Sequence, residues 1–363
     1  MSDQRISVMQ VIDGLAFGGA ERMAVNMANS LPRDRYRVHL CTTRSEGPLA
    51  ALIHDDVGRI ALNRSSRLSE PRAVYALLRY IRQHDIRILH SHQSTVFLCS
   101  LVSLFCPSVV IVWHDHWGEG YERSRWLYRL GTLRVRAIIA VNDQLASWAK
   151  EGLGFPEDRV HFARNFVVTA SAGGIPDLPP TTGRRIVCVA NVRPQKDMVN
   201  LVMAVALVAK EIPDIQVLVV GNQGDLAYLE TVKKAISEYG LGERVILLGA
   251  RSDVTDILEC CDIGVLSSEW EGLPLSLIEY GMAGLATVAT NVGQCSEVLG
   301  NGRYGILVPP GDPQSLAEGI IGLLRSDSER KALGREFQCA TIEEWGPDRN
   351  IVQFVDIYDS VLE

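Results

Sequence analysis

Short apolar segments rich in β-branched residues alternate with helix-patterned segments along almost the whole chain, and this alternation limits the possible folds more than any other feature. In the first half the predicted strands are 6–12, 37–42, 86–90, 109–113 and 137–141. In the second half they are 185–190, 215–220, 244–248, 262–266, 286–290 and 306–308. Strands that alternate with helices form parallel sheets with helices on both faces. We therefore predict an α/β protein with two successive, doubly wound parallel-sheet domains.

A stretch without periodicity, rich in Pro, Gly, Ser and Thr, separates the two halves. We place an interdomain linker at 171–183, between an N-terminal domain at 1–170 and a C-terminal domain at 184–345. The terminal helix at 346–363 is in a position to pack back on the first domain. Ligands of doubly wound sheets bind outside the carboxyl ends of the strands, so the cleft that the two domains face is the expected site.

Composition excludes several classes of protein. No apolar run approaches the roughly 20 residues of a membrane-spanning helix, and the first residues lack the pattern of a signal peptide. A cytoplasmic protein is expected. The eight cysteines contain no Cys-x-x-Cys pair, so we expect free, mostly buried thiols rather than a zinc ribbon or a disulfide framework.

The charge is distributed unevenly. Residues 1–180 hold 21 Lys and Arg against 17 Asp and Glu, a net charge of +4, and the remainder of the chain carries −11. Five arginines in the segment 123–136 are interleaved with aromatic and leucine side chains, an arrangement suited to an anionic membrane surface. An ordinary solvated helix face is an equally weighted interpretation. No nucleic-acid partner is expected.

Two loops of the first half carry candidate site residues. The turn after the first strand contains Gly18 and Gly19 and opens into a helix, so its backbone amides are able to approach a phosphate or a sugar hydroxyl. A plain structural turn explains this loop equally well.

Four of the eight histidines cluster at predicted strand ends, as His90 and His92 and as His114 and His116. Imidazoles are metal ligands. We expect the side chains of His114 and His116 to point to opposite sides of their extended segment, which disfavours a metal site. One of the two is expected to bind a substrate hydroxyl, and the other to be structural.

The second half has two further loops. Arg193 and Lys196 lie between a strand and a helix in an otherwise acidic domain, where two cations can neutralise a departing diphosphate. Pro274 is predicted as the first residue of a helix, whose amides provide an anion seat. Glu271 precedes this helix and Glu279 lies within it, so the pair can accept hydrogen bonds from hydroxyls at two ends of one elongated ligand.

These residues resemble the retaining glycosyltransferases of family 4, whose GT-B fold has two Rossmann-like domains, with the acceptor-side domain first. The most specific part is the Glu-x7-Glu motif from Glu271 to Glu279. The resemblance implies that Glu271 lies by the donor sugar, that Glu279 binds the ribose, and that Lys196 binds the diphosphate. His116 best matches the histidine near the reacting centre, with His114 second.

The resemblance also implies a set of nucleotide-sugar-binding residues. They are Arg193, Lys196, Gly221, Arg251, Glu271, Gly272, Leu273, Pro274, Leu275 and Glu279. His116, Glu271 and Lys196 are the expected catalytic residues, and Gly18, Gly19 and His114 the expected acceptor or phosphate contacts. The family's phosphate-binding arginine is missing here, and Arg193, two residues later, is the candidate to replace it.

The resemblance implies transfer of a sugar from a nucleotide-sugar to a hydroxyl of a glycan or lipid-linked acceptor, with retention and without a metal or other cofactor. We expect a role in envelope or exopolysaccharide biosynthesis, at the inner face of the cell membrane. Two alternatives remain, a nucleotide-sugar epimerase of the same fold and a non-catalytic, glycosyltransferase-like partner subunit. An epimerase acts without an acceptor, and a partner subunit lacks turnover.

Overall fold

The computed structural model describes residues 5–65, 70–116, 123–168, 174–181 and 183–363. The chain forms two compact units, which are described separately below. Unit 1 comprises 1–168 together with 347–363, and unit 2 comprises 169–346. Within the segment expected as a linker, residues 171–173 and 182 lie outside the described residues.

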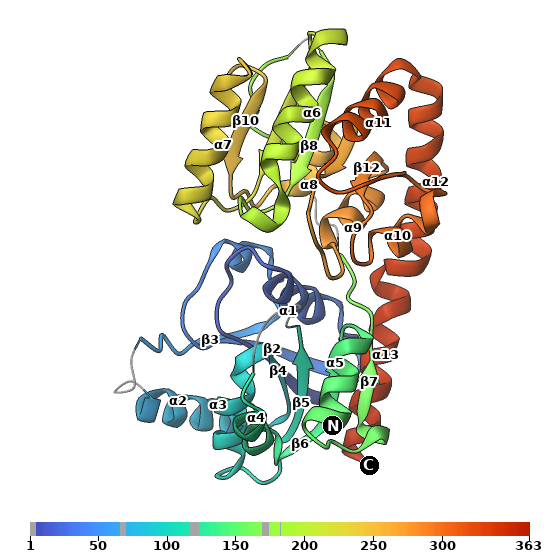
Figure 1. Ribbon diagram of the computed structural model, residues 1–363. Helices are drawn as coiled ribbons and strands as arrows, with labels where there is room; N and C mark the ends of the chain where they lie inside the picture. The colour runs from blue at the N-terminus through green and yellow to red at the C-terminus, as the bar shows by residue number, and fades with distance from the viewer. Residues whose placement is uncertain (1–4, 66–69, 117–122, 169–173, 182) are drawn as a thin grey trace. The chain divides into compact units, whose positions relative to one another are not determined.

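Unit 1 contains a seven-stranded parallel sheet in the order β3-β2-β1-β4-β5-β6-β7 (Figure 1). Its strands are β1 (Ile6–Ile12), β2 (Tyr36–Thr42), β3 (Gly58–Ala61), β4 (Ile86–His92), β5 (Val110–Asp115), β6 (Val135–Ala140) and β7 (Val160–Phe162). Its α-helices are α1 (Gly19–Ser30), α2 (Glu70–Gln83), α3 (Val96–Ser103), α4 (Arg125–Thr132), α5 (Asp143–Ser147) and α13 (Pro347–Leu362). Short 3-10 or π turns occur at Pro48–Leu52, Gln93–Thr95, Trp148–Gly152 and Glu157–Arg159.

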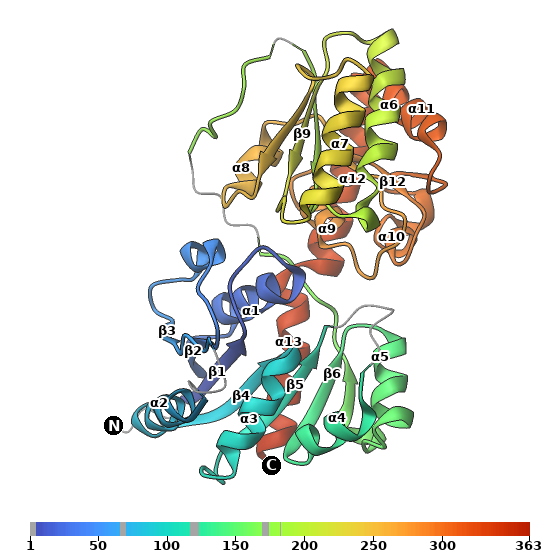
Figure 2. The same cartoon turned by 60° about the vertical axis from the view of Figure 1, so that its left-hand side comes forward.

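Helices cover both faces of this sheet, so unit 1 has two cores. One core packs α1 and α13 against the sheet, with Met23 and Phe354 among its buried side chains. The other packs α2, α3 and α4 on the opposite face, with Leu77 and Val102 among its members (Figure 2). Side chains alternate across a strand, and β-branched strands buried on both faces are typical of parallel sheets.

Unit 2 contains a six-stranded parallel sheet in the order β10-β9-β8-β11-β12-β13. Its strands are β8 (Arg185–Val189), β9 (Gln216–Val220), β10 (Val245–Gly249), β11 (Ile263–Leu266), β12 (Ala286–Thr290) and β13 (Ile306–Val308). Its α-helices are α6 (Met198–Glu211), α7 (Leu226–Glu238), α8 (Val254–Glu259), α9 (Leu275–Met282), α10 (Cys295–Val298), α11 (Pro313–Arg325) and α12 (Asp327–Trp345). Two 3-10 turns occur at Pro194–Lys196 and Gly300–Gly302.

The α/β fold with two doubly wound parallel sheets is confirmed. Two edge strands, β3 and β7, were not expected from the sequence. The terminal helix α13 belongs to unit 1, although the segment directly before it, 169–346, forms unit 2. Among the described residues, no helix has the length and apolar character that a membrane crossing requires.

Candidate active site

Lys196 and Glu271 form an ion pair in unit 2. The Lys196 Nζ atom lies 2.6 and 2.7 Å from the two carboxylate oxygens of Glu271. The Glu271 side chain is 5% exposed and the Lys196 side chain 20% exposed. The hydroxyl of Ser268 donates a further hydrogen bond of 2.6 Å to Oε1 of Glu271. A carboxylate this buried requires a counter-charge and hydrogen bonds, so both side chains are held in fixed positions.

Two neighbouring strands position this pair, because the loops that follow β8 and β11 lie side by side at the carboxyl edge of the sheet. The hydroxyl of Ser267 donates to the carbonyl of Lys196 at 2.9 Å. The amide of Glu269 donates to the carbonyl of Gln195 at 2.9 Å. The two loops are therefore joined by backbone contacts as well as by the ion pair. Sequence reasoning missed both serines, whose only signal is their place directly after a predicted strand.

The helix α9 begins at Leu275, one residue later than predicted. Pro274 is its N-cap, with φ −79° and ψ 97°, outside the helical region. Gly272 is exposed, and a Cβ added there would meet no atom within 4 Å. Leu273 and Glu279 are half-buried. The backbone amides at the start of α9 therefore come a few residues after Glu271, and the space beside Gly272 is open.

The loop after β12 packs against the same site. Gly293 has a φ of +52°, and a Cβ added there would overlap the carbonyl oxygen of Glu271 and lie 2.9 Å from that of Gly272. The amide of Gln294 donates to the carbonyl of Gly272 at 3.0 Å. Only glycine fits this approach, and sequence reasoning did not single it out.

Gly221 follows β9 and lies against the loop after β8. A Cβ added there would overlap the carbonyl oxygen of Ala190 and lie 2.8 Å from the amide nitrogen of Asn191. The side-chain oxygen of Asn191 accepts a hydrogen bond of 2.9 Å from the amide of Asn222. Gly221 thus allows the loops after β8 and β9 to approach each other closely.

The two predicted arginines of unit 2 have different surroundings. Arg251, after β10, pairs with Asp253 at 2.6 Å and donates to the carbonyl of Asp177 at 3.2 Å. The hydrogen bond from Arg251 holds the pKa of Asp253 below its usual value. Arg193 is exposed and is the N-cap of the 3-10 turn that ends at Lys196.

In unit 1, the loop after β1 contains Gly18 and Gly19. Gly18 is the N-cap of α1, and its φ of −160° is extended backbone that any residue adopts. A Cβ added at Gly18 would overlap the carboxylate of Glu21. The end of a glutamate side chain is able to move aside, so neither this contact nor the backbone conformation requires glycine at this position.

The four predicted histidines come together in unit 1, at the carboxyl ends of β4 and β5. The expectation that His114 and His116 point to opposite sides is wrong. Their rings are 3.9 Å apart, and those of His90 and His92 are 4.7 Å apart. Residues two apart on a strand share one face, so both pairs project on the same side of the sheet.

Hydrogen bonds link these rings in two chains. His92 Nδ1 lies 2.9 Å from His116 Nε2, and His92 Nε2 lies 2.9 Å from the side-chain oxygen of Gln10. His90 Nε2 lies 3.1 Å from His114 Nδ1. Sequence reasoning missed Gln10, whose signal is a long polar side chain within the mostly apolar strand β1.

The second chain reaches the terminal helix α13. His90 Nδ1 lies 2.6 Å from the hydroxyl of Tyr358, which also accepts a hydrogen bond of 3.1 Å from the side-chain nitrogen of Gln10. Desolvation lowers the pKa of His90 and of His116 to about 3. It holds the pKa of His92 and of His114 well below the usual value. The four rings are therefore neutral near pH 7.

Three of these rings have the spacing of a metal site. Ligand atoms of His90, His92 and His114 all lie within 4.8 Å of one another, and all three side chains are buried. Most of their nitrogen atoms are already hydrogen-bonded to one another, to Gln10 or to Tyr358. A cation would have to replace these bonds. The Nε2 atom of His114 is buried without a hydrogen-bond partner among the described residues.

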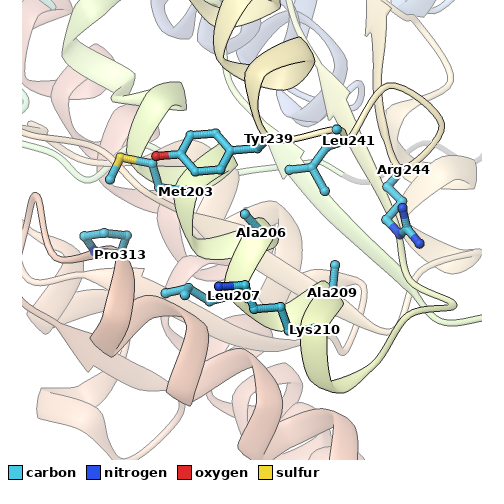
Figure 3. Close-up of a pocket in the computed structure, with 10 residues that line it drawn as sticks. Met203, Ala206, Leu207, Ala209, Lys210, Tyr239, Leu241, Arg244 and Pro313 are labelled. Carbon is cyan, nitrogen blue, oxygen red and sulfur yellow. The ribbon is translucent and has the colours of Figure 1, made fainter.

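A cavity of about 350 Å³ lies elsewhere in unit 2 (Figure 3). Its lining comes from α6, including Met203 and Lys210, from Tyr239 to Arg244 before β10, and from Pro313. None of the predicted site residues lines it.

Several curated proteins with similar sequences are named as glycosyltransferases. The chain is 26% identical over 246 residues to N-acetyl-alpha-D-glucosaminyl L-malate synthase of Bacillus anthracis, covering 65% of this chain and 62% of that protein. It is 21% identical over 330 residues to the UDP-Gal:alpha-D-GlcNAc-diphosphoundecaprenol alpha-1,3-galactosyltransferase of Escherichia coli, covering 84% of each. The chain thus spans about three fifths of the length of the first relative.

Solved structures show the same fold. A glycosyltransferase from Rickettsia africae superimposes with a TM-score of 0.78 at 18% identity, covering 99% of each chain. The Anabaena protein HepE, in complex with UDP and glucose, gives a TM-score of 0.79 at 18% identity, covering 98% of this chain and 100% of that one. At these identities the likeness concerns the fold alone.

The GT-B class of glycosyltransferases has two doubly wound domains of this kind. The family model for glycosyl transferases group 1 matches residues 176–338, and the model for glycosyltransferase family 4 matches residues 17–171. The chain belongs to the glycosyltransferase family that these two models describe, as its Glu-x7-Glu motif indicated.

Proposed function

We propose that this protein is a retaining, metal-independent glycosyltransferase that moves a hexose from a nucleotide-sugar to a hydroxyl of a glycan or lipid-linked acceptor. The observation that carries the proposal is the buried carboxylate of Glu271, paired with Lys196 at the carboxyl edge of the unit 2 sheet. This is the edge at which doubly wound sheets bind their ligands.

In this proposal the donor diphosphate lies beside Lys196. The ammonium group has three donors, so it can keep its contact with Glu271 and also bind a phosphate oxygen. Arg193 and the amides at the start of α9 add positive potential as charge develops on the departing diphosphate. Glu279 binds the ribose, and the loop at Arg251 lies by the base.

Retention is proposed to occur by displacement on one face of the sugar. The bond between the anomeric carbon and the phosphate oxygen breaks, the bond to the acceptor oxygen forms on the same face, and the acceptor proton passes to the departing phosphate oxygen. Both oxygens of Glu271 lie within 2.7 Å of Lys196 Nζ. A carboxylate engaged in this way is a poor nucleophile, which favours this route over a covalent intermediate.

The donor and acceptor are inferred from similar proteins. The Escherichia coli relative is named for a UDP-galactose donor and a diphosphoundecaprenol-linked acceptor. Another relative is the phosphatidyl-myo-inositol mannosyltransferase of Mycolicibacterium smegmatis, 27% identical over 263 residues. We therefore propose a nucleotide-activated hexose, a lipid-linked acceptor, and a role in envelope or exopolysaccharide assembly at the cytoplasmic face of the membrane.

The helix α4 offers a surface for that membrane. Trp126 and Leu133 are 67% and 76% exposed, and Leu104 and Phe105, at the end of the contacting helix α3, are also exposed. The side chain of Arg125 is exposed beside them. Aromatic and leucine side chains flanked by arginines suit the interface of an anionic bilayer.

Not every arginine of the segment 123–136 is available to the membrane. Arg123 pairs with the buried carboxylate of Asp115 at 2.6 Å and stacks on Trp148 at 3.7 Å, so it serves the interior of unit 1. The exposed positions are Arg125, Arg129, Arg134 and Arg136.

Membrane contact is tested by sedimentation with vesicles containing phosphatidylglycerol, compared with vesicles of phosphatidylcholine. The double variant Trp126→Ser, Leu133→Ser should lose most of the binding. Leu226→Ser is the matched control, because Leu226 is 70% exposed but lies on α7 of unit 2. Equal binding by both variants, or none by the native protein at low salt, would count against the proposal.

Catalysis is tested with a panel of nucleotide-sugars, by measuring nucleotide release with and without membrane extract. Lys196→Ala and Glu271→Ala should each lower turnover by about 100-fold or more. Turnover should survive a chelator, and the product should keep the anomeric configuration of the donor. Conversion of the donor without any acceptor would indicate an epimerase. Nucleotide-dependent thermal stabilisation without turnover would be consistent with a partner subunit.

A further inference from the structure

We propose that the Gln10 carboxamide is a positioning group that fixes the protonated nitrogen of His116 through His92. The proposal rests on the proposed function to the extent that His116 contacts a sugar hydroxyl. Gln10 lies in β1 and His92 in β4, the neighbouring strand, and both side chains are fully buried. His116 follows directly after β5, the next strand along, and is half-buried.

The first step concerns His92. The side-chain oxygen of Gln10 has no proton, so His92 Nε2 must be the donor in the 2.9 Å contact between them. A neutral imidazole carries one N–H, and burial keeps this ring neutral. His92 Nδ1 is therefore an acceptor.

The second step transfers this constraint to His116. His92 Nδ1 accepts, so His116 Nε2 must carry the proton in the 2.9 Å contact between the two rings. Their rings stack at 5.2 Å with an interplanar angle of 15°, which also fixes the ring plane of His116. His116 Nδ1 is then the unprotonated nitrogen, and the ring presents an acceptor to a sugar hydroxyl.

The Gln10 amide also contacts the terminal helix α13. Its nitrogen donates to the hydroxyl of Tyr358 at 3.1 Å, and that hydroxyl directs its own proton to His90 Nδ1 at 2.6 Å. His90 Nε2 then donates to His114 Nδ1 at 3.1 Å. A reversed amide would require every donor and acceptor in both chains to exchange roles.

Two branches therefore leave Gln10, and only one reaches His116. The branch through Tyr358 ends at His114, whose Nε2 carries the proton and is buried without a hydrogen-bond partner among the described residues. This difference provides a matched control. Tyr358→Phe removes a bond to Gln10 but leaves the contacts from Gln10 through His92 to His116.

The experiment uses the full chain labelled with nitrogen-15 histidine. Long-range proton–nitrogen correlation spectra report which ring nitrogen carries the proton. In the native protein, His92 and His116 should both be protonated at Nε2. Gln10→Met should leave His116 in a mixture of tautomers, whereas Tyr358→Phe should keep the native tautomer. A native His116 protonated at Nδ1, or an unchanged tautomer in Gln10→Met, would overturn the proposal.

Kinetics give a second readout. Gln10→Met should lower kcat by about tenfold or more, with the donor KM within about twofold of the native value. Gln10→Glu retains a side-chain oxygen that accepts from His92, so it should recover most of the lost kcat. Tyr358→Phe should retain the native kcat. Loss of kcat in all three variants alike would indicate a merely structural role and refute the proposal.

The two proposals fail in different ways. If the tautomers are as stated but His116→Ala and Gln10→Met both turn over normally, the positioning network stands and the role of His116 in the proposed function is wrong. If His116→Ala is inactive while Gln10→Met keeps both the native tautomer and the native kcat, the proposed function stands and the role of Gln10 is wrong.

Discussion

The hydroxyl of Tyr280 accepts a hydrogen bond of 2.7 Å from the amide of Val189, at the end of β8. The same hydroxyl donates at 3.1 Å to the carbonyl of Val265 in β11. The Tyr280 ring lies over Gly264, where an added Cβ would come within 2.6 Å of the ring. Tyr280 thus ties α9, which carries Glu279, to the two strands whose following loops hold the Lys196–Glu271 pair.

The first prediction concerns this hydroxyl. Tyr280→Phe leaves the amide of Val189 without its buried partner, a loss that costs about 1–3 kcal/mol. Urea unfolding followed by a probe in unit 2 should show a decrease of this size in the free energy of unfolding. Tyr239→Phe is the control, because Tyr239 is on the same unit and is exposed. Equal stability of the two variants would contradict the assigned role of Tyr280.

The second prediction concerns the close approach at Gly293. Gly293→Ala combines a strained positive φ with an overlap against the carbonyl of Glu271. It should lower stability by about 1–3 kcal/mol and weaken nucleotide binding by moving the backbone at Glu271. Gly311→Ala is the matched control, since Gly311 has a φ of +66° but no atom within 4 Å of an added Cβ.

Calorimetric titration with nucleotide checks this prediction. Gly311→Ala should lose about 1 kcal/mol of stability while it keeps the native affinity. Gly293→Ala should lose at least about tenfold in affinity, which is about 1.4 kcal/mol. If the two variants bind nucleotide equally, the strain alone matters and the packing of this loop on Glu271 has no effect on the site.

The position of the predicted site residues in the fold could be read from the sequence, but their partners could not. Alternation of strands and helices places Lys196 and Glu271 in loops at the carboxyl edge of one sheet. It does not say that β8 and β11 are neighbours, because strand order depends on crossovers that local patterns do not encode. The ion pair between residues 75 positions apart was therefore not predicted.

The histidine cluster shows the same limit. The sequence placed all four rings at strand ends, and the register of β4 and β5 brings His92 opposite His114. The error over His114 and His116 came from the wrong strand periodicity. Tyr358 could not be foreseen as a partner of Gln10, because the two residues are 348 positions apart and meet only when α13 returns to unit 1.

The third prediction concerns the energy of the Lys196–Glu271 pair. Lys196→Met leaves the Glu271 carboxylate buried and without its cation, and Glu271→Gln leaves the ammonium without its counter-charge. Each single variant should lose about 1–3 kcal/mol of stability, less than a fully buried pair because Lys196 is 20% exposed. The double variant should lose less than the sum of the two. Additive losses in this double-mutant cycle would mean that the contact contributes nothing.

The last prediction concerns acid. Burial lowers the pKa of His90 and His116 to about 3 and that of His39 to about 4. The unfolded chain, with a histidine pKa of about 6.5, therefore binds more protons than the folded chain below that pH. The contribution of these neutral rings to the free energy of unfolding is fully present above pH 6.5. It is lost as the pH falls from there toward the pKa values of the folded state.

Each buried histidine can contribute at most about 1.4 kcal/mol per pH unit in this window. Urea unfolding of unit 1 should therefore show a loss of several kcal/mol between about pH 7.5 and 5.5, before most carboxylates titrate. His39→Gln should reduce the slope of the unfolding free energy against pH by at most the amount that one bound proton contributes. A flat profile over this range would mean that the buried rings take up protons in the folded state as readily as in the unfolded chain, which would contradict the lowered pKa values.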